Sequence, residues 1–132
     1  SAWDDAYLRR IHQIVAMSTA ANAYVMWIGL PVMEPPRYRA GANLLNALYA
    51  QEVTQVPGAT FVPLWTLFAT AGGDFHQSAP VNGQTQILRQ PDGIHFSVAG
   101  EDVAATYVAR QISAVYGVAL HPAEPAVLTP VR

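Results

Sequence analysis

An aspartate and a histidine stand three positions apart in the segment QPDGIHFSVAG, residues 90–100. Proline and glycine predict a loop at the start of this segment, and Ser97 is a residue type that often begins helices. In such a loop the carboxylate of Asp92 can accept a hydrogen bond from one ring nitrogen of His95, which leaves the other nitrogen free to act as a base. An exposed histidine beside an aspartate in an ordinary turn has the same spacing, so the spacing alone leaves both interpretations open.

The elements that position this loop follow from the hydrophobic pattern. Apolar residues at helical spacing predict a helix over residues 4–20. The continuous apolar run of residues 24–32 predicts a strand that is buried on both faces of a parallel sheet and stops at Pro31. A second helix is expected over residues 34–52, and a short second strand over residues 58–65. The order helix, strand, helix, strand predicts an α/β layer fold.

The rest of the chain is less regular. Residues 71–90 are rich in turn formers and are expected to leave the core, with a small hairpin at Asn82-Gly83. Ser97 is expected to cap a final helix that ends at Gly117. The apolar stripe of that helix would consist of Ala104, Val108, Ile112 and Val115. Residues 118–132 contain three prolines and no period, so they form a linker, a surface strap or a disordered tail.

Composition excludes several classes of function. The 132 residues carry a net charge of −2 and seven scattered arginines, which is unlike a nucleic-acid-binding surface. The absence of cysteine excludes disulfides, thiolate catalysis and cysteine zinc sites. The longest apolar runs are too short to span a bilayer. Asp74 and His76 are of metal-binding types, but their spacing is not diagnostic, and we predict neither a metal nor a cofactor.

The block PDGIHFSVAG, followed by a helix, resembles the last sequence block of the SGNH hydrolases, the GDSL-like esterase and lipase superfamily. The stretches YVMWIGLPVMEPPRY, NLLNALYAQE and TFVPLWTLFATAGGDF resemble the C-terminal half of a bacterial branch of that superfamily, earlier catalogued as a domain of unknown function. The resemblance extends from about residue 3 to about residue 116. It implies a three-layer, flavodoxin-like α/β fold in which residues 1–117 are the C-terminal part, followed by a proline-rich tail, residues 118–132.

By this resemblance Asp92 and His95 are the acid and the base of a Ser-His-Asp triad. The family's nucleophilic serine and its oxyanion-hole residues lie in earlier blocks, none of which is present here. Their source would be an N-terminal SGNH segment, of the same gene product or of another chain, and this chain alone is expected to be inactive. Ser97 is expected to serve as a helix cap, and Ser78 has no nucleophile elbow around it. A sheet of two strands also has two open edges, which favours additional strands.

The function implied by the resemblance is hydrolysis of an O-acyl ester by a serine esterase, or acyl transfer to a second acceptor. Related SGNH proteins act on envelope polysaccharides or peptidoglycan, which implies a periplasmic or secreted location. Trp65, Phe75 and Met33 are candidates for substrate contact, with core packing as the alternative for the two aromatic residues. The competing hypothesis is a non-catalytic SGNH-like module that binds or assembles an acylated glycan without cleaving it.

Overall fold

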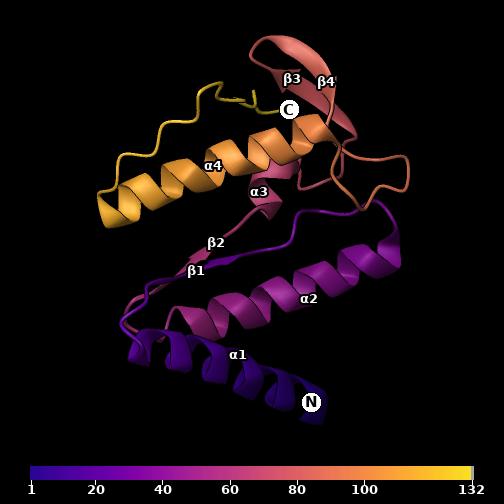
Figure 1. The fold of residues 1–132 in the computed structure, drawn as a ribbon. Coiled ribbons are helices and arrows are strands. Elements are labelled where there is room, and N and C mark those ends of the chain that lie inside the picture. Colours follow the sequence, from indigo (N-terminus) through magenta and orange to yellow (C-terminus); the bar gives the residue numbers. More distant parts are fainter. Residues whose placement is uncertain (132) are drawn as a thin grey trace.

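The computed structural model describes residues 1–131, so that Arg132, the end of the predicted tail, lies outside the described residues (Figure 1). The fold is mixed α/β. Strands β1 and β2 pair in parallel, and β3 and β4 pair as an antiparallel hairpin. The elements in chain order are α1 (Ala2–Ala20), β1 (Val25–Ile28), α2 (Pro36–Val53), β2 (Ala59–Val62), α3 (Trp65–Phe68), β3 (Ser78–Val81), β4 (Gln84–Ile87) and α4 (Val98–Tyr116).

Helices lie on both faces of the β1–β2 sheet, with α1 and α2 on one side and α3 and α4 on the other (Figure 1). Trp27 packs against the apolar cluster of α1 and α2, whereas its neighbour Ile28 packs against the cluster beneath α4. Successive residues of a strand point to opposite faces, and for this reason one short strand contributes to two cores. Within the described residues, no helix is long and apolar enough to span a membrane.

Strand β1 is less buried than its apolar sequence predicts. All four residues of Val25–Ile28 are half-buried, although burial on both faces was expected. Parallel sheets are normally covered on both faces and contain more than two strands, whereas β1 has the single partner β2 among residues 1–131. The composition of β1 therefore suits a larger sheet than these residues form.

Asn46 on α2 fixes the chain where it leaves β1. Its side chain accepts a hydrogen bond from the amide of Leu30 at 2.7 Å and donates one to the carbonyl of the same residue at 2.8 Å. A Cβ on Gly29 would lie 2.8 Å from the ring of Phe61, so the backbone passes α2 and β2 closely at this point. The loop after β1, residues 29–34, consequently leaves the sheet in a fixed direction.

The prediction that residues 71–90 leave the core is wrong for part of this segment. Ala79 and Val81 of β3 and Leu88 after β4 are buried in the cluster beneath α4. Residues 71–74 and the turn and strand of residues 82–87 are exposed, as the prediction requires. In β3 every second residue is buried and the residues between them are half-buried. The many Gly, Pro and Asn residues around this short strand favoured a loop in the prediction.

The predicted hairpin turn at Asn82-Gly83 is confirmed, with φ values of 51° and 81°. This turn also holds the tail. The Asn82 amide donates to the carbonyl of Val127 at 3.0 Å, and the Asn82 side chain accepts from the Val127 amide at the same distance. The Thr129 amide donates to the carbonyl of Pro80 at 2.9 Å. Of the three alternatives for the tail, the structure therefore shows a surface strap.

The cap of α4 is as predicted, because Ser97 Oγ accepts a hydrogen bond from the Gly100 amide at 3.1 Å. The apolar stripe is partly wrong. Val115 is 44% exposed, and the fully buried residues of α4 are Gly100, Val103 and Thr106. The tail contacts one of these buried residues, since the Ala126 amide donates to Thr106 Oγ1 at 3.0 Å.

Two glycines in helices should respond oppositely to replacement by alanine. A Cβ on Gly100 would collide with the backbone carbonyl of Leu88, whose carbonyl carbon would lie at 3.0 Å, so Gly100→Ala should destabilise the chain by about 1–3 kcal/mol. A Cβ on Gly41 in α2 would meet no atom within 4 Å apart from the adjoining backbone of its own helix, so Gly41→Ala should stabilise the chain by about 0.5–1 kcal/mol. Urea unfolding of both variants measures the difference; equal effects would contradict the close packing of α4.

Candidate catalytic site

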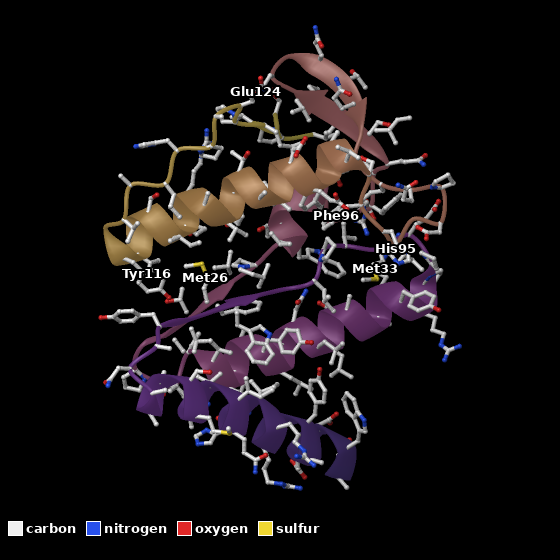
Figure 2. All side chains as sticks on the ribbon, viewed as in Figure 1. Met26, Met33, His95, Phe96, Tyr116 and Glu124 are labelled. Carbon is white, nitrogen blue, oxygen red and sulfur yellow. The ribbon has the colours of Figure 1, made fainter. Side chains whose placement is uncertain are left out.

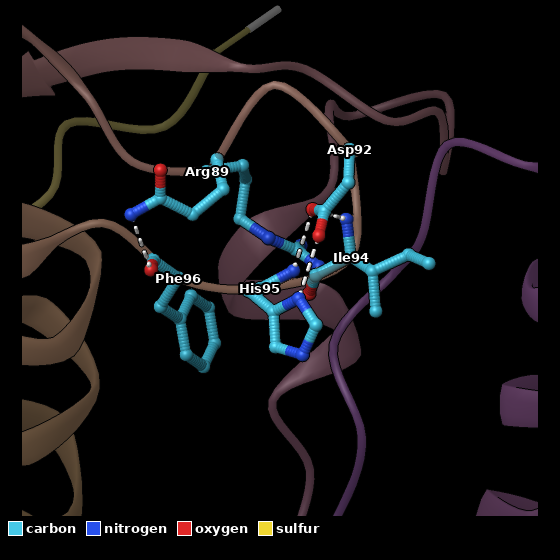
Figure 3. Close-up of polar contacts among 6 residues, drawn as sticks. Arg89, Asp92, Ile94, His95 and Phe96 are labelled. Atoms are coloured by element: carbon cyan, nitrogen blue, oxygen red, sulfur yellow. Dashed lines mark hydrogen bonds and ion pairs between the residues drawn. The ribbon is translucent and has the colours of Figure 1, made fainter.

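The loop of residues 90–95 brings Asp92 and His95 together (Figure 3). Asp92 Oδ2 accepts a hydrogen bond from His95 Nδ1 over 2.6 Å. Because the carboxylate has no proton to donate, the proton of the neutral imidazole is assigned to Nδ1, and Nε2 keeps a free lone pair. Nε2 points away from Asp92 in Figure 3, which leaves it able to accept a proton from another group.

The backbone of this loop holds the carboxylate in place. Asp92 Oδ1 accepts hydrogen bonds from the amides of Ile94 at 2.8 Å and His95 at 3.0 Å. Gly93, which separates Asp92 from Ile94, has a φ of 66° that favours glycine. The Gln90 amide donates to the carbonyl of His95 at 2.8 Å and closes the loop. The dyad is therefore built by local contacts.

These contacts lower the pKa of Asp92 from 3.8 to about 2. The largest cause is the hydrogen bond from His95, followed by the amides of Ile94 and His95, which also favour the charged carboxylate. A carboxyl group whose pKa is lower in the folded than in the unfolded chain stabilises the fold above its unfolded pKa. Asp92 should therefore stabilise the loop above pH 3.8, and this contribution should disappear as the pH falls through about 2.

Removing the imidazole should raise this pKa. In His95→Ala the pKa of Asp92 should move upward toward 3.8, because the largest cause of its lowering is lost. The ¹³C shift of the Asp92 carboxyl group, followed against pH, measures the change. His12→Ala serves as the control and should leave the value at about 2. An Asp92 pKa that is the same in both variants would show that His95 does not hold the carboxylate.

The dyad is open to solvent. The side chain of His95 is 76% exposed and that of Asp92 is 44% exposed. The imidazole is thus accessible to a substrate or to another polypeptide, and nothing in residues 1–131 encloses it. Exposure also means that water screens the ion pair that forms when the imidazole takes up a proton.

The loop after β1 contacts the loop of the dyad. The Glu34 amide donates to the carbonyl of Gly93 at 3.0 Å, and a Cβ on Gly93 would collide with the side chain of Glu34. On the other side, Arg39 of α2 donates from Nε to the carbonyl of Met33 at 2.8 Å. Met33 lies beside His95 in Figure 2, in agreement with these loop contacts. The end of β1 and the dyad are consequently held at one edge of the molecule.

The three candidates for substrate contact are not equally close to this edge. Met33 belongs to the loop that contacts the dyad. Trp65 and Phe75 are half-buried and pack against the cluster beneath α4, as the core alternative for aromatic residues predicted. A role of any of the three in substrate binding stays a prediction.

Neither Ser78 nor Ser97 is placed as a nucleophile beside His95. Ser97 Oγ donates to the carbonyl of Ile87 while it caps α4, which confirms its expected structural role. Ser78 lies on β3 in the hairpin. Within the described residues, no serine is hydrogen-bonded to His95.

The remaining histidines do not join the dyad. His12 Nδ1 lies 2.6 Å from Glu52 Oε1, an exposed pair that connects α1 to α2. His76 Nδ1 donates to the carbonyl of Ser78 at 3.0 Å. Across residues 1–131, no three or more Asp, Glu or His side chains gather as a metal site would require, so Asp74 and His76 are not combined with Asp92 and His95.

Sequence reasoning missed Arg89, which is fully buried between the two loops. Its guanidinium group donates to the carbonyls of Val32 and Ile94. The local sequence contains no signal for this burial, because Ile87, two residues earlier, is apolar and yet 61% exposed.

The sequence of this chain matches a protein family. A family model described as "Protein of unknown function (DUF459)" matches residues 1–111. These residues include α1, both parallel strands, the loop of the dyad and most of α4. No curated protein matches the chain.

Proposed function

The chain belongs to the DUF459 family of proteins of unknown function, and we propose that it supplies the acid and the base of an SGNH-type serine esterase. The observation that carries this proposal is the 2.6 Å hydrogen bond between Asp92 Oδ2 and His95 Nδ1. It leaves the exposed Nε2 of His95 in the state that a general base requires. The resemblance of the block PDGIHFSVAG to the last SGNH block supports the same assignment.

In the proposed reaction a serine from outside this chain attacks the acyl carbon of an ester. Nε2 of His95 takes the proton of that serine hydroxyl and returns it to the oxygen of the departing alcohol. A water molecule then releases the acyl group by the same proton transfers, or a second alcohol accepts it. Asp92 keeps the imidazole in the required tautomer and stabilises its charged form. No cofactor takes part.

The proposed complete fold is the three-layer flavodoxin-like SGNH architecture, in which this chain is the C-terminal portion. The parallel pairing of β1 and β2, the helices on both faces and the half-buried β1 support it. An N-terminal SGNH segment, of the same gene product or of another chain, would add strands, the nucleophile and the oxyanion hole. Ligands of open α/β sheets bind beyond the carboxyl ends of the strands, and the loop that follows the carboxyl end of β1 is hydrogen-bonded to the loop of the dyad.

The proposed substrate is an O-acyl ester of an envelope polysaccharide or of peptidoglycan, in a periplasmic or secreted setting. This part of the proposal rests on the resemblance alone. Met33 would contact the substrate directly, because it lies beside His95. Trp65 and Phe75, which pack against the cluster beneath α4, would line the inner wall of the binding site.

The test is ester hydrolysis by the full-length gene product, or by the purified complex that contains this chain. Acetylated xylan and O-acetylated peptidoglycan serve as substrates, with released acetate as the readout. Hydrolysis should fall on acidification, because a protonated His95 cannot act as a base. Binding of the acylated glycan without release of acetate at any pH would instead favour the non-catalytic module.

A further inference from the structure

Arg89 is a cation that is buried without an acidic partner. Its side chain has no accessible surface, and none of the ion pairs of the described residues includes it. Burial lowers the pKa of Arg89 to about 10, which the nearby charge of Asp92 partly offsets, so the guanidinium group is still protonated at neutral pH. Burying an unpaired charge is costly, and such a residue persists only where other contacts compensate.

The contacts of Arg89 reach two separate loops. Nη1 donates to the carbonyl of Val32 at 2.6 Å, in the loop after β1, and Nη2 donates to the carbonyl of Ile94 at 2.5 Å, in the loop of the dyad. The centre of the guanidinium group lies 5.5 Å from the ring centre of Phe75 and 5.0 Å from that of Phe96, within the range of cation–π attraction. Arg89 thus joins Val32 to Ile94, and no other side chain among residues 1–131 hydrogen-bonds to both.

Ile94 is the point at which this contact acts on the dyad. Its amide donates to Asp92 Oδ1, and its carbonyl accepts from Arg89 (Figure 3). A rotation of the backbone at Ile94 would therefore disturb both hydrogen bonds and the adjoining His95. The planar guanidinium fork can hold two carbonyls that lie apart, which the single ammonium group of a lysine cannot do in the same geometry.

We propose that Arg89 is a positioning residue that locks the Asp92–His95 loop to the loop after β1 and so sets the place of His95 Nε2. This inference rests on the proposed function for its catalytic meaning. Its structural part stands on the two hydrogen bonds and the two aromatic rings alone.

The first test uses the wild-type chain labelled with ¹⁵N. Because the two η nitrogens hold different carbonyls, exchange between them by rotation should be slow, and Arg89 should give separate Nη signals at 25 °C. One averaged Nη signal would overturn the proposal without recourse to any variant.

The second test compares Arg89→Lys and Arg89→Met with Arg10→Met, which removes an exposed arginine from α1. Hydrogen exchange at the amides of Ile94 and His95 should become about tenfold faster or more in both Arg89 variants and stay unchanged in the control. The amides of α1 and α2 report whether each variant is folded. Unchanged exchange at Ile94 and His95 in a folded Arg89 variant would overturn the proposal.

Kinetics separate this inference from the proposed function. In the active full-length protein, Arg89→Lys should lower kcat by about 100-fold with little change in KM, because a displaced base slows the reaction more than it weakens binding. Loss of amide protection with kcat intact would overturn the positioning role while the esterase stands. Absence of hydrolysis in the wild type would overturn the proposed function, and the NMR tests, which need no substrate, would still decide the structural role of Arg89.

Discussion

Replacement of His95 by alanine should lower ester hydrolysis by the full-length protein by about 10⁴-fold or more. The variant removes the only group that the proposed mechanism uses to take and return the proton of the nucleophile. The side chain is 76% exposed, so its loss should leave the fold intact. Initial rates at a saturating ester concentration, with circular dichroism as a check of folding, measure the effect.

His12→Ala is the matched control for this variant. His12 also has a carboxylate partner at 2.6 Å and is also exposed, but it joins α1 to α2 rather than lying in the loop of residues 90–95. Its removal should leave hydrolysis unchanged. If His95→Ala retained the wild-type rate, the base would have to be another group and the mechanism would be wrong.

Replacement of Asp92 by asparagine should lower kcat by about 10⁴-fold, because an amide can donate to Nδ1 and thereby favour the tautomer with its proton on Nε2. In that tautomer Nε2 carries the ring proton and has no lone pair with which to accept the proton of the serine. The ¹⁵N shifts of the His95 ring should show that the ring proton has moved from Nδ1 to Nε2 in the variant, and kcat should be correspondingly low. Glu52→Gln makes the same chemical change at His12 and should leave kcat as it is. A normal kcat in Asp92→Asn with a changed tautomer would remove Asp92 from the mechanism.

The dyad and its loop could be predicted because their geometry is local. Asp92, Gly93 and His95 lie within four residues, and the turn they form needs only a short side-chain acceptor and a glycine. The same holds for the cap of α4 at Ser97 and the hairpin turn at Asn82-Gly83, where one residue type meets one backbone requirement. Such features are determined by a few adjacent residues, so they can be predicted from the local sequence.

The features that were missed depend on residues far apart in the chain. The exposure of Val115 and the burial of Gly100 and Thr106 depend on how the hairpin and the tail cover α4, which the pattern of α4 alone does not encode. Arg89 looked like one of seven scattered arginines, and only its position 57 residues from Val32 in sequence, yet 2.6 Å from its carbonyl, reveals what it does. The half-burial of β1 likewise reflects the size of the sheet.

The most direct measurement treats the full-length gene product, or the complex that contains this chain, with a fluorophosphonate serine probe and maps the label by mass spectrometry. We expect one labelled serine outside residues 1–132, and loss of that label in His95→Ala. A label on Ser78 or Ser97 would contradict the assignment of the nucleophile to another segment. The absence of any label, together with binding of an acylated glycan, would contradict the esterase and favour the binding module.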